Sequence, residues 1–521
     1  MMNFAKIIVV ITVVSAAIME LIDTSIVNVG LNQMAGSLGI TIEDASWVIT
    51  SYAVANVVII PLTGFFQKYF GRKNYYLASI VIFTISSYFC GTAGDLWTLV
   101  FFRFLQGIGG GALLSVSQGI LFDTFPIEQR PLASAMFGIG VVLGPTFGPT
   151  IGGIILDNYH WAWMFFINLP IGALALLLSY IFIEKSPEES HIDRSKIKVD
   201  TWGIALLALW VGPLQYILER GSADDWFESP TILRLTLLCV VSLIGFLWWE
   251  LKTPNPVVDI RVFRNRNLLI GTILTVVVGF GLFGSVFLYP LFAQRIIGFS
   301  AKETGMFVIP GTLIALFFFP LIGKLLTKGA SPRNFVFIGY ILFFAFVMAM
   351  SRLNADATAS FFLWIMLLRG IGLAFTNMPL INSTVSTLAP KDMPMGIAMT
   401  NMFRQLGGAM GIAIINTYIS HRSAAHRNDL WSQLVPGSPA YEERMNMMTN
   451  GLVARGVNPL EAPQAALSNL RYIIEKQALM LSYLDSFQLT GLFFVASLPL
   501  ILLIQKRKAT AASMKAASEA H

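Results

Sequence analysis

Two carboxylates interrupt the first apolar stretch of the chain, in the sequence MELIDTSIVN. The apolar run before them, residues 7–18, is too short to cross a bilayer, which takes about 20 residues, so the crossing must continue through Glu20 and Asp23. An ionisable group at mid-membrane costs roughly 2.5–3.5 kcal/mol and marks a functional site by default. At about 100° per residue both acids lie on one helical face, with Thr24 between them and Asn28 one turn beyond Thr24. We expect the two acids to share or exchange a proton.

Arg103 is another charged residue within an apolar stretch, RFLQGIGGGALL. A guanidinium inside a spanning helix needs a partner unless it reaches the outer interface, and the sequence leaves both alternatives open. The glycines that follow Gln106 allow another backbone to approach closely. Arg369 and Arg404 are further cations within apolar segments, and we expect them to pair with backbone carbonyls.

The stretch GIGVVLGPTFGPTIGG combines glycine with proline inside a segment of helix length. The pairs Gly144-Pro145 and Gly148-Pro149 are one turn apart, and Gly152 follows one turn later. Proline removes a helical hydrogen bond and bends the axis, while the glycines leave a face without side chains. Such a helix either rocks against a close neighbour or packs passively with a kink.

The stretch FFQKYFGRKNYYL joins the second and third apolar segments. Gly64 precedes it, and Gly71 predicts a tight turn before Arg72 and Lys73. By charge alone, the basic residues indicate only which side of the membrane the loop occupies.

The composition identifies an integral membrane protein. Of the 521 residues 55% are hydrophobic and 12% are charged, whereas soluble domains carry about 25% charged residues. The net charge of +6 comes from short basic runs between apolar segments, which argues against nucleic-acid binding. Cys90 and Cys239 lie inside apolar segments, and His421 and His426 lie beside arginines, so we expect no disulfide, metal site or cofactor.

Apolar windows of about 18–25 residues predict an all-α membrane protein with fourteen transmembrane helices. The windows lie near residues 7–29, 46–66, 75–93, 97–120, 133–156, 162–183, 201–219, 231–250, 267–292, 303–323, 334–351, 360–387, 395–419 and 486–505. Most Lys and Arg fall in alternate loops, and the opposite short loops are rich in Asp and Glu. The positive-inside rule therefore predicts that both termini are cytoplasmic.

An internal repeat divides the chain. PLTG at residues 61–64 recurs as PLIG at 320–323, and QGIG at 106–109 recurs as RGIG at 369–372, each about 260 residues later. We infer an N-terminal six-helix half (1–200), a two-helix insert (201–250) and a C-terminal six-helix half (251–521). The long segment 420–485 is expected on the outer side, either as a solvated helical hairpin or as a contact for a partner.

Several of these motifs resemble signatures of the major facilitator superfamily. Gly64-x6-Gly71-Arg72-Lys73 is similar to its cytoplasmic loop signature, although Lys68 stands where the family has an acidic residue. The pattern R-x-x-Q-G-x-G in RFLQGIGG looks like the family's helix-four motif, whose arginine serves proton transfer. The pattern G-x3-G-P-x2-G-P-x2-G-G is close to the signature of proton-coupled exporters, which symporters of the superfamily generally lack.

The stretch DTSIVNV resembles the D-x-T-[IV]-V-N-V pattern of fourteen-helix drug:proton antiporters of the EmrB/QacA type, although Gly30-Leu31-Asn32 replaces the family's Ala-Leu-Pro. NYHWAWMFFINLPIG, ERGSADDWF and NMFRQLGGAMG are further similar segments, so the resemblance extends over nearly the whole chain. It is closest to EmrB-like multidrug exporters of tripartite efflux systems, which work with a periplasmic adaptor and an outer-membrane channel.

The resemblance implies a major facilitator fold and proton-coupled efflux of hydrophobic or amphipathic compounds from a bacterial inner membrane, without enzymatic activity. It implies that Asp23 carries the proton with Arg103 as its partner. Glu20 is not part of the family pattern, and its role is left open between tuning Asp23, binding a cationic substrate and facing a wet cavity. The antiporter motif comprises Gly144, Pro145, Gly148, Pro149 and Gly152, and the gating loop comprises Gly64, Gly71 and Arg72. Candidate substrate contacts are Asn28, Gln106, Phe283, Tyr289 and Asn377. A dedicated exporter of one metabolite, such as a fatty acid, siderophore or lysolipid, and a proton-coupled importer are the alternatives.

Overall fold

The computed structural model describes residues 4–126, 129–184, 199–354 and 359–505, and the secondary structure of these residues is helical, without strands. The long helices are α1 (Phe4–Leu38), α3 (Trp47–Phe70), α4 (Arg72–Gly91), α5 (Leu96–Thr124), α6 (Arg130–Asn158), α8 (Asn168–Phe182), α9 (Thr201–Arg220), α10 (Pro230–Lys252), α11 (Arg266–Phe292), α12 (Ala301–Thr327), α13 (Pro332–Met350), α14 (Ala359–Val385), α15 (Met393–Ser432) and α17 (Ala462–Ile501). Shorter helices include α2 (Ile42–Ala45), α7 (Trp163–Phe166) and α16 (Pro439–Ala454). The all-helical prediction is confirmed.

Within the described ranges, 12 helices are long and apolar enough to cross a membrane. The two remaining predicted segments, 75–93 and 395–419, form α4 and α15, which are helical but more polar in composition. α15 packs against α11, α17, α3 and α5, so much of its surface meets protein rather than lipid. The chain is a multi-pass membrane protein, and the count of fourteen spans stays a prediction for these two helices.

The repeated motifs make equivalent contacts in the two parts of the bundle. Gly64 on α3 lies against the α15 backbone, where a β-carbon would be 3.2 Å from Met395 Cα. Gly323, its counterpart on α12, lies against α6, where a β-carbon would be 3.1 Å from Ala135 Cβ. The internal repeat of the sequence therefore corresponds to a repeat of helix contacts.

The QGIG and RGIG motifs also place a glycine against the backbone of a neighbouring helix. Gly109 on α5 approaches the α4 backbone at Phe83, and Gly372 on α14 approaches the α13 backbone at Phe343. Since a larger residue at either glycine would meet a backbone atom, both positions keep the neighbouring helices in close contact.

The two largest of five buried clusters of apolar side chains lie in different parts of the bundle. One is built mainly by α11, α13, α14 and α17, and the other mainly by α1, α4, α5 and α6. Helices α9 and α10 pack against each other, and α9 also packs against α3. Many large apolar residues of α10 are exposed, as expected for a helix that faces lipid.

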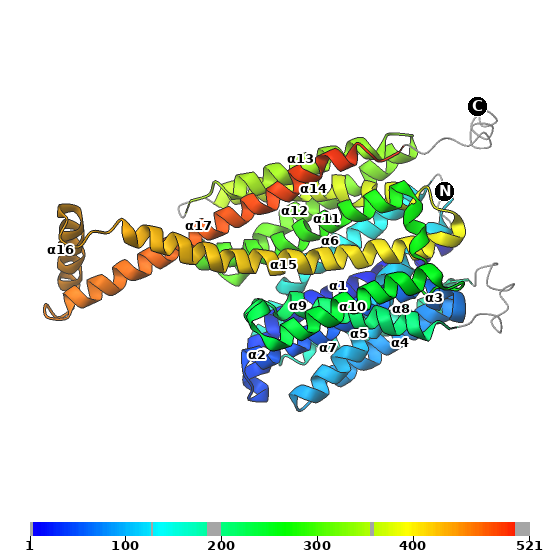
Figure 1. Ribbon diagram of the computed structural model, residues 1–521, viewed down its shortest axis with the longest axis horizontal. Helices are drawn as coiled ribbons and strands as arrows, with labels where there is room; N and C mark the ends of the chain where they lie inside the picture. Colours follow the sequence, from blue (N-terminus) through cyan, green and yellow to red (C-terminus); the bar gives the residue numbers. More distant parts are fainter. Residues whose placement is uncertain (1–3, 127–128, 185–198, 355–358, 506–521) are drawn as a thin grey trace.

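An arm formed by α15, α16 and α17 projects from one end of the bundle (Figure 1). The sequence predicted a non-membrane segment from residue 420, and the structure shows that α15 continues through it to Ser432. At the base of the arm, Asp485 accepts hydrogen bonds from Arg422 Nε at 2.6 Å and from His426 Nε2 at 2.8 Å. α1 begins and α17 ends at the opposite end of the bundle, which we call the terminal end (Figure 1).

Candidate functional site

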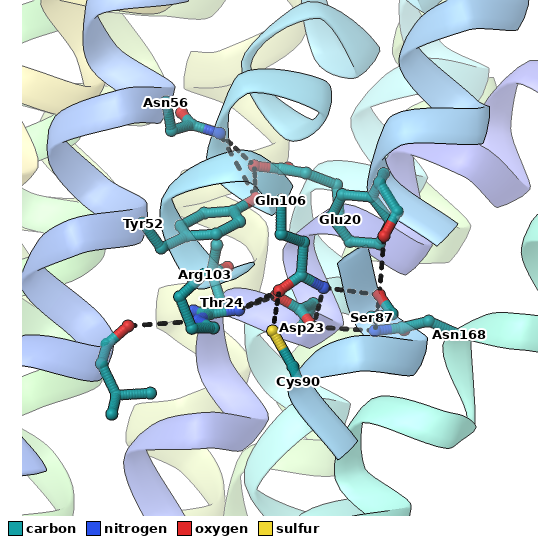
Figure 2. A network of polar contacts seen from close by, with 12 residues as sticks. Glu20, Asp23, Thr24, Tyr52, Asn56, Ser87, Cys90, Arg103, Gln106 and Asn168 are labelled. Atoms are coloured by element: carbon teal, nitrogen blue, oxygen red, sulfur yellow. Dashed lines mark hydrogen bonds and ion pairs between the residues drawn. The ribbon is translucent and has the colours of Figure 1, made fainter. Parts of the chain in front are cut away.

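Asp23 is fully buried on α1, and three side chains from two other helices donate hydrogen bonds to its carboxylate (Figure 2). Arg103 Nη1 lies 2.6 Å from Oδ2, while Gln106 Nε2 lies 2.9 Å and Asn168 Nδ2 2.7 Å from Oδ1. Arg103 and Gln106 belong to α5 and Asn168 begins α8. The two carboxylate oxygens therefore join α1, α5 and α8.

The position of Arg103 excludes the interfacial alternative. Its side chain is 1% exposed, and its Nε donates to the Val48 carbonyl at 3.1 Å. The guanidinium also lies over the Tyr52 ring, 4.2 Å from the centroid. Because a buried ion pair repays its desolvation only when the remaining donors and acceptors are satisfied, these additional contacts stabilise the pair.

Gln106 links the ion pair to α4. Its amide nitrogen donates to Asp23 and to Ser87 Oγ, the latter at 2.6 Å, and its amide oxygen accepts from Arg103 at 2.7 Å. The Cys90 thiol is a further, weaker donor to that oxygen, at 3.9 Å. The amide is thus held on all sides, which fixes the orientation of the Asp23 carboxylate.

Glu20 has its own partners. Its Oε1 accepts hydrogen bonds from the Tyr52 hydroxyl at 3.1 Å and from Asn56 Nδ2 at 3.2 Å, and its Oε2 has no hydrogen-bond partner among the described residues. Glu20 and Asp23 therefore share no hydrogen bond. Tyr52 links Glu20 to the Asp23–Arg103 pair, because its hydroxyl donates to Glu20 and its ring contacts Arg103. That the two acids exchange a proton stays a prediction.

The Gly-Pro motif lies on α6 and packs directly against the helix that carries both acids. A β-carbon on Gly144 would overlap Leu21, one on Gly148 would overlap Ser25, and one on Gly152 would crowd Ile26. Pro145 and Pro149 lie inside α6 beside these glycines. In addition, Ser25 Oγ donates to the Gly144 carbonyl at 3.3 Å. The arrangement places a glycine-rich, side-chain-poor face of α6 against α1.

The predicted gating loop lies at the terminal end. Gly71 has φ +83°, a conformation that favours glycine, and it separates α3 from α4. Arg72 forms an ion pair with Asp123 near the end of α5, and Lys73 Nζ donates to the Tyr180 carbonyl at 2.7 Å. Lys68 is exposed. Arg72 therefore connects the start of α4 to α5.

The five candidate substrate contacts lie on four helices and do not form one cluster. Gln106 belongs to the Asp23 network, whereas Asn28 is exposed and its amide donates to the Thr24 carbonyl. Three others lie on α11 or α14. Phe283 packs beside Gly408, the Tyr289 hydroxyl donates to the Thr304 carbonyl at 3.2 Å, and Asn377 is buried with its Nδ2 unpartnered among the described residues.

Sequence reasoning missed four residues of the two networks: Tyr52, Asn56, Ser87 and Asn168. Asn168 is the one with a usable signal, because it is a lone amide in the apolar stretch FFINLP. The others are uncharged polar residues of a kind common in membrane helices, and only the packing of α3 and α4 against α5 brings them to the site.

Comparison with known proteins adds to this geometry. The model of the Major Facilitator Superfamily matches residues 13–412. The chain is 35% identical to "Multidrug export protein EmrB" of Escherichia coli (strain K12), over 81% of this chain and 82% of that protein. It is 31% identical to "Fatty acid resistance protein FarB" of Neisseria gonorrhoeae, over 94% of each chain. The crystal structure of the human organic anion transporter MFSD10 has the same fold, with a TM-score of 0.57 at 16% identity over 94% of this chain and 99% of that one.

Proposed function

Because the chain belongs to the Major Facilitator Superfamily and shares its fold, we propose that it exports hydrophobic or amphipathic compounds in exchange for protons, by alternating access. Its similarity to "Multidrug export protein EmrB" supports efflux of several compounds. The observation that carries the proposal is the buried Asp23–Arg103 pair, whose carboxylate lies on α1, the same helix that packs against the Gly-Pro helix α6.

Asp23 is the proposed proton carrier. Its carboxylate is held by Arg103, Gln106 and Asn168 when ionised, and protonation removes the charge that attracts Arg103. A change in the proton on Asp23 therefore alters the contact between α1 and α5. One inward proton supplies about 2.3 kcal/mol per 100 mV, which is enough for a roughly fifty-fold gradient of a neutral substrate at 1.4 kcal/mol per decade.

Helix α6 is the proposed element that transmits this change. Its glycines contact α1, and the same helix packs against α12. With residues 1–200 and 251–521 as two halves that rock about the central site, α6 connects the proton site to the opposite half. The insert 201–250 accompanies the first half, because α9 packs against α3.

The proposed location is the inner membrane of a bacterium, with the terminal end in the cytoplasm. The basic loop with Lys68, Arg72 and Lys73 lies at that end, in agreement with the positive-inside rule. The arm then projects into the periplasm, where Leu460 at its tip is 91% exposed. We propose that the arm binds a periplasmic adaptor protein and, through it, an outer-membrane channel.

The coupling experiment measures substrate-induced proton release from the purified wild type and from Asp23→Asn and Glu20→Gln. Wild type is expected to release protons, and Asp23→Asn is expected not to. Proton release and uphill export by Asp23→Asn would refute the proposal. The effect of Glu20→Gln decides whether Glu20 belongs to the same proton site.

The adaptor experiment replaces residues 433–461, which contain α16, with a short Gly-Ser linker. The Arg422–Asp485 contact at the base of the arm is kept. We expect loss of adaptor association with substrate binding unchanged. Unchanged association would mean that the arm is simply a solvated hairpin.

A dedicated exporter of one metabolite is a second candidate, favoured by the similarity to "Fatty acid resistance protein FarB" over 94% of both chains. A substrate panel across unrelated chemical types distinguishes the two candidates. Export of a single chemical type would support the dedicated exporter.

A further inference from the structure

Buried charge is distributed unevenly in the interior. Among the described residues, the buried charged side chains of helices α11 to α17 are Arg369 and Arg404, and this group contains no carboxylate. Asp23 and Arg103 neutralise each other on the other side of the bundle. The other buried carboxylates among the described residues, Glu20 and Glu250, lie on α1 and α10, so neither arginine has a buried carboxylate on its own helix or on its neighbours α11 to α17.

Arg404 lacks the partners that a buried guanidinium needs. It is 5% exposed, and its Nη1 is buried without a hydrogen-bond partner among the described residues. Arg369 donates from Nε to Ser285 Oγ at 3.2 Å. The expectation that both arginines pair with backbone carbonyls was wrong, because neither guanidinium donates to a backbone carbonyl of the described residues. An unsatisfied buried charge is unfavourable, so an anion that accepts a hydrogen bond from Arg404 would be bound there favourably.

Arg404 faces the opposite half of the protein. One turn before it on α15, Asn401 donates to Ser115 and Gln118 of α5, at 3.1 and 3.3 Å. Arg404 and Glu20 interact electrostatically, but they do not form an ion pair. Because Glu20 Oε2 also lacks a partner among the described residues, α1 and α15 each carry one unsatisfied buried group, and the two groups have opposite charge.

Two further arginines line a cavity at the terminal end. Its volume is about 400 Å³, and it lies between the ends of α5, α12 and α14. Arg130 and Arg333 line it together with apolar residues such as Phe122 and Leu326, and the described residues of its lining include no carboxylate. Such a cavity suits a molecule with an apolar tail and an anionic head group.

We propose that Arg404 binds the anionic head group of an amphiphilic substrate, which reaches it from the cavity beside Arg130 and Arg333. This inference rests on the proposed export function and narrows its substrate class to amphiphiles with one carboxylate, sulfonate or similar anionic head. Arg404 supplies the charge and up to five N–H donors, and Glu20 opposes the anion from the other half.

The test uses the full chain in nanodiscs of neutral lipid and two probes of fixed charge. 1-Dodecanesulfonate is the anionic probe and dodecyltrimethylammonium is the cationic probe with the same tail. Binding is measured by titration calorimetry. Wild type is expected to prefer the anion by about tenfold or more, and Arg404→Gln is expected to weaken anion binding by at least about tenfold, which corresponds to 1.4 kcal/mol.

Three further variants make the result specific. Arg404→Lys keeps the charge and should retain most of the anion affinity. Glu20→Gln removes the opposing charge and should strengthen anion binding several-fold while weakening cation binding. Arg352→Gln, an exposed position on the bundle, should behave as wild type. If Arg404→Gln does not fold, Arg404→Lys and Glu20→Gln still decide the question.

Equal anion binding by wild type and folded Arg404→Gln would overturn the proposal, as would a preference of wild type for the cation or no effect of Glu20→Gln. A failure of the proposed export function can be distinguished from a failure of this inference. Substrate-induced proton release with a cationic drug, without any preference for anions, would refute this inference alone. Anion preference without proton release by any substrate would refute the coupling alone.

Discussion

Gly148 of α6 packs against Ser25 of α1 so closely that no β-carbon fits between the two residues. The Ser25 hydroxyl donates to the Gly144 carbonyl on the same face of α6. We predict that Gly148→Ala separates the two helices, lowers the free energy of unfolding by about 1–3 kcal/mol and reduces the export rate at least tenfold. Thermal unfolding and transport in proteoliposomes measure the two effects.

The same helix offers a control for this prediction. Gly153 has open space where its β-carbon would lie, so Gly153→Ala should be neutral. The double variant Gly148→Ala with Ser25→Gly removes the atoms that collide and should recover part of the lost stability. Wild-type export by Gly148→Ala would show that the close contact between α1 and α6 is dispensable.

The Asp23–Arg103 pair predicts a charge-balance effect on folding. Arg103→Gln leaves the Asp23 carboxylate buried without its counter-charge, and we expect a loss of about 3–5 kcal/mol in unfolding free energy. Asp23→Asn combined with Arg103→Gln removes both charges and should be clearly more stable than Arg103→Gln alone. Neither variant should release protons on substrate binding. Equal stability of the single and double variants would contradict the predicted coupling between the charges.

Asn168 provides a test of a residue that has no charge. Its amide donates to Asp23 at 2.7 Å and to Ser87 at 3.3 Å, so Asn168→Leu leaves two buried acceptors with fewer donors. We expect a loss of about 1–3 kcal/mol in stability and slower export. The matched control is Asn158→Leu, because Asn158 is exposed and its amide contacts only its own helix. Equal effects of both substitutions would rule out a special role for Asn168.

The ion pair between Arg72 and Asp123 is partly exposed, with side chains 16% and 52% accessible. Its contribution to stability should therefore be below about 1 kcal/mol. We nevertheless predict that Arg72→Asp slows export, because the pair connects α4 to α5 at the terminal end. The exchanged pair Arg72→Asp with Asp123→Arg should restore part of the rate. If the exchanged pair does not restore the rate, the defect of Arg72→Asp comes from the loss of the other contacts of Arg72.

The helical fold could be predicted from apolar segment lengths, because a backbone in lipid must satisfy its own hydrogen bonds. The same reasoning placed α4 and α15, although both are too polar to be recognised by composition alone. It gave only the membrane part of α15, to residue 419, whereas the helix itself continues to Ser432 in the segment predicted to lie outside the membrane. Apolar composition indicates which residues can contact lipid. A helix can continue into solvent beyond those residues.

The site was only partly predictable. Asp23, Glu20 and Arg103 are visible in the sequence because a charge in an apolar run is rare. Their different partners are not visible, because residues one turn apart on the same helix face different neighbours once α3, α5 and α8 pack around α1. For the same reason Arg404 looked like an ordinary carbonyl-bonded cation, and its lack of partners emerged only from the packed structure.

The unbroken helices of the arm make it a lever. From Asp485 at its base to Ala462, α17 spans roughly 35 Å at 1.5 Å per residue, and a tilt of roughly 10° in one half of the bundle moves its tip by about 6 Å. The contacts of Asp485 with Arg422 and His426 hold α15 and α17 together, so both swing as one body. With the proposed alternating access, the displacement of α16 would report which way the transport site is open.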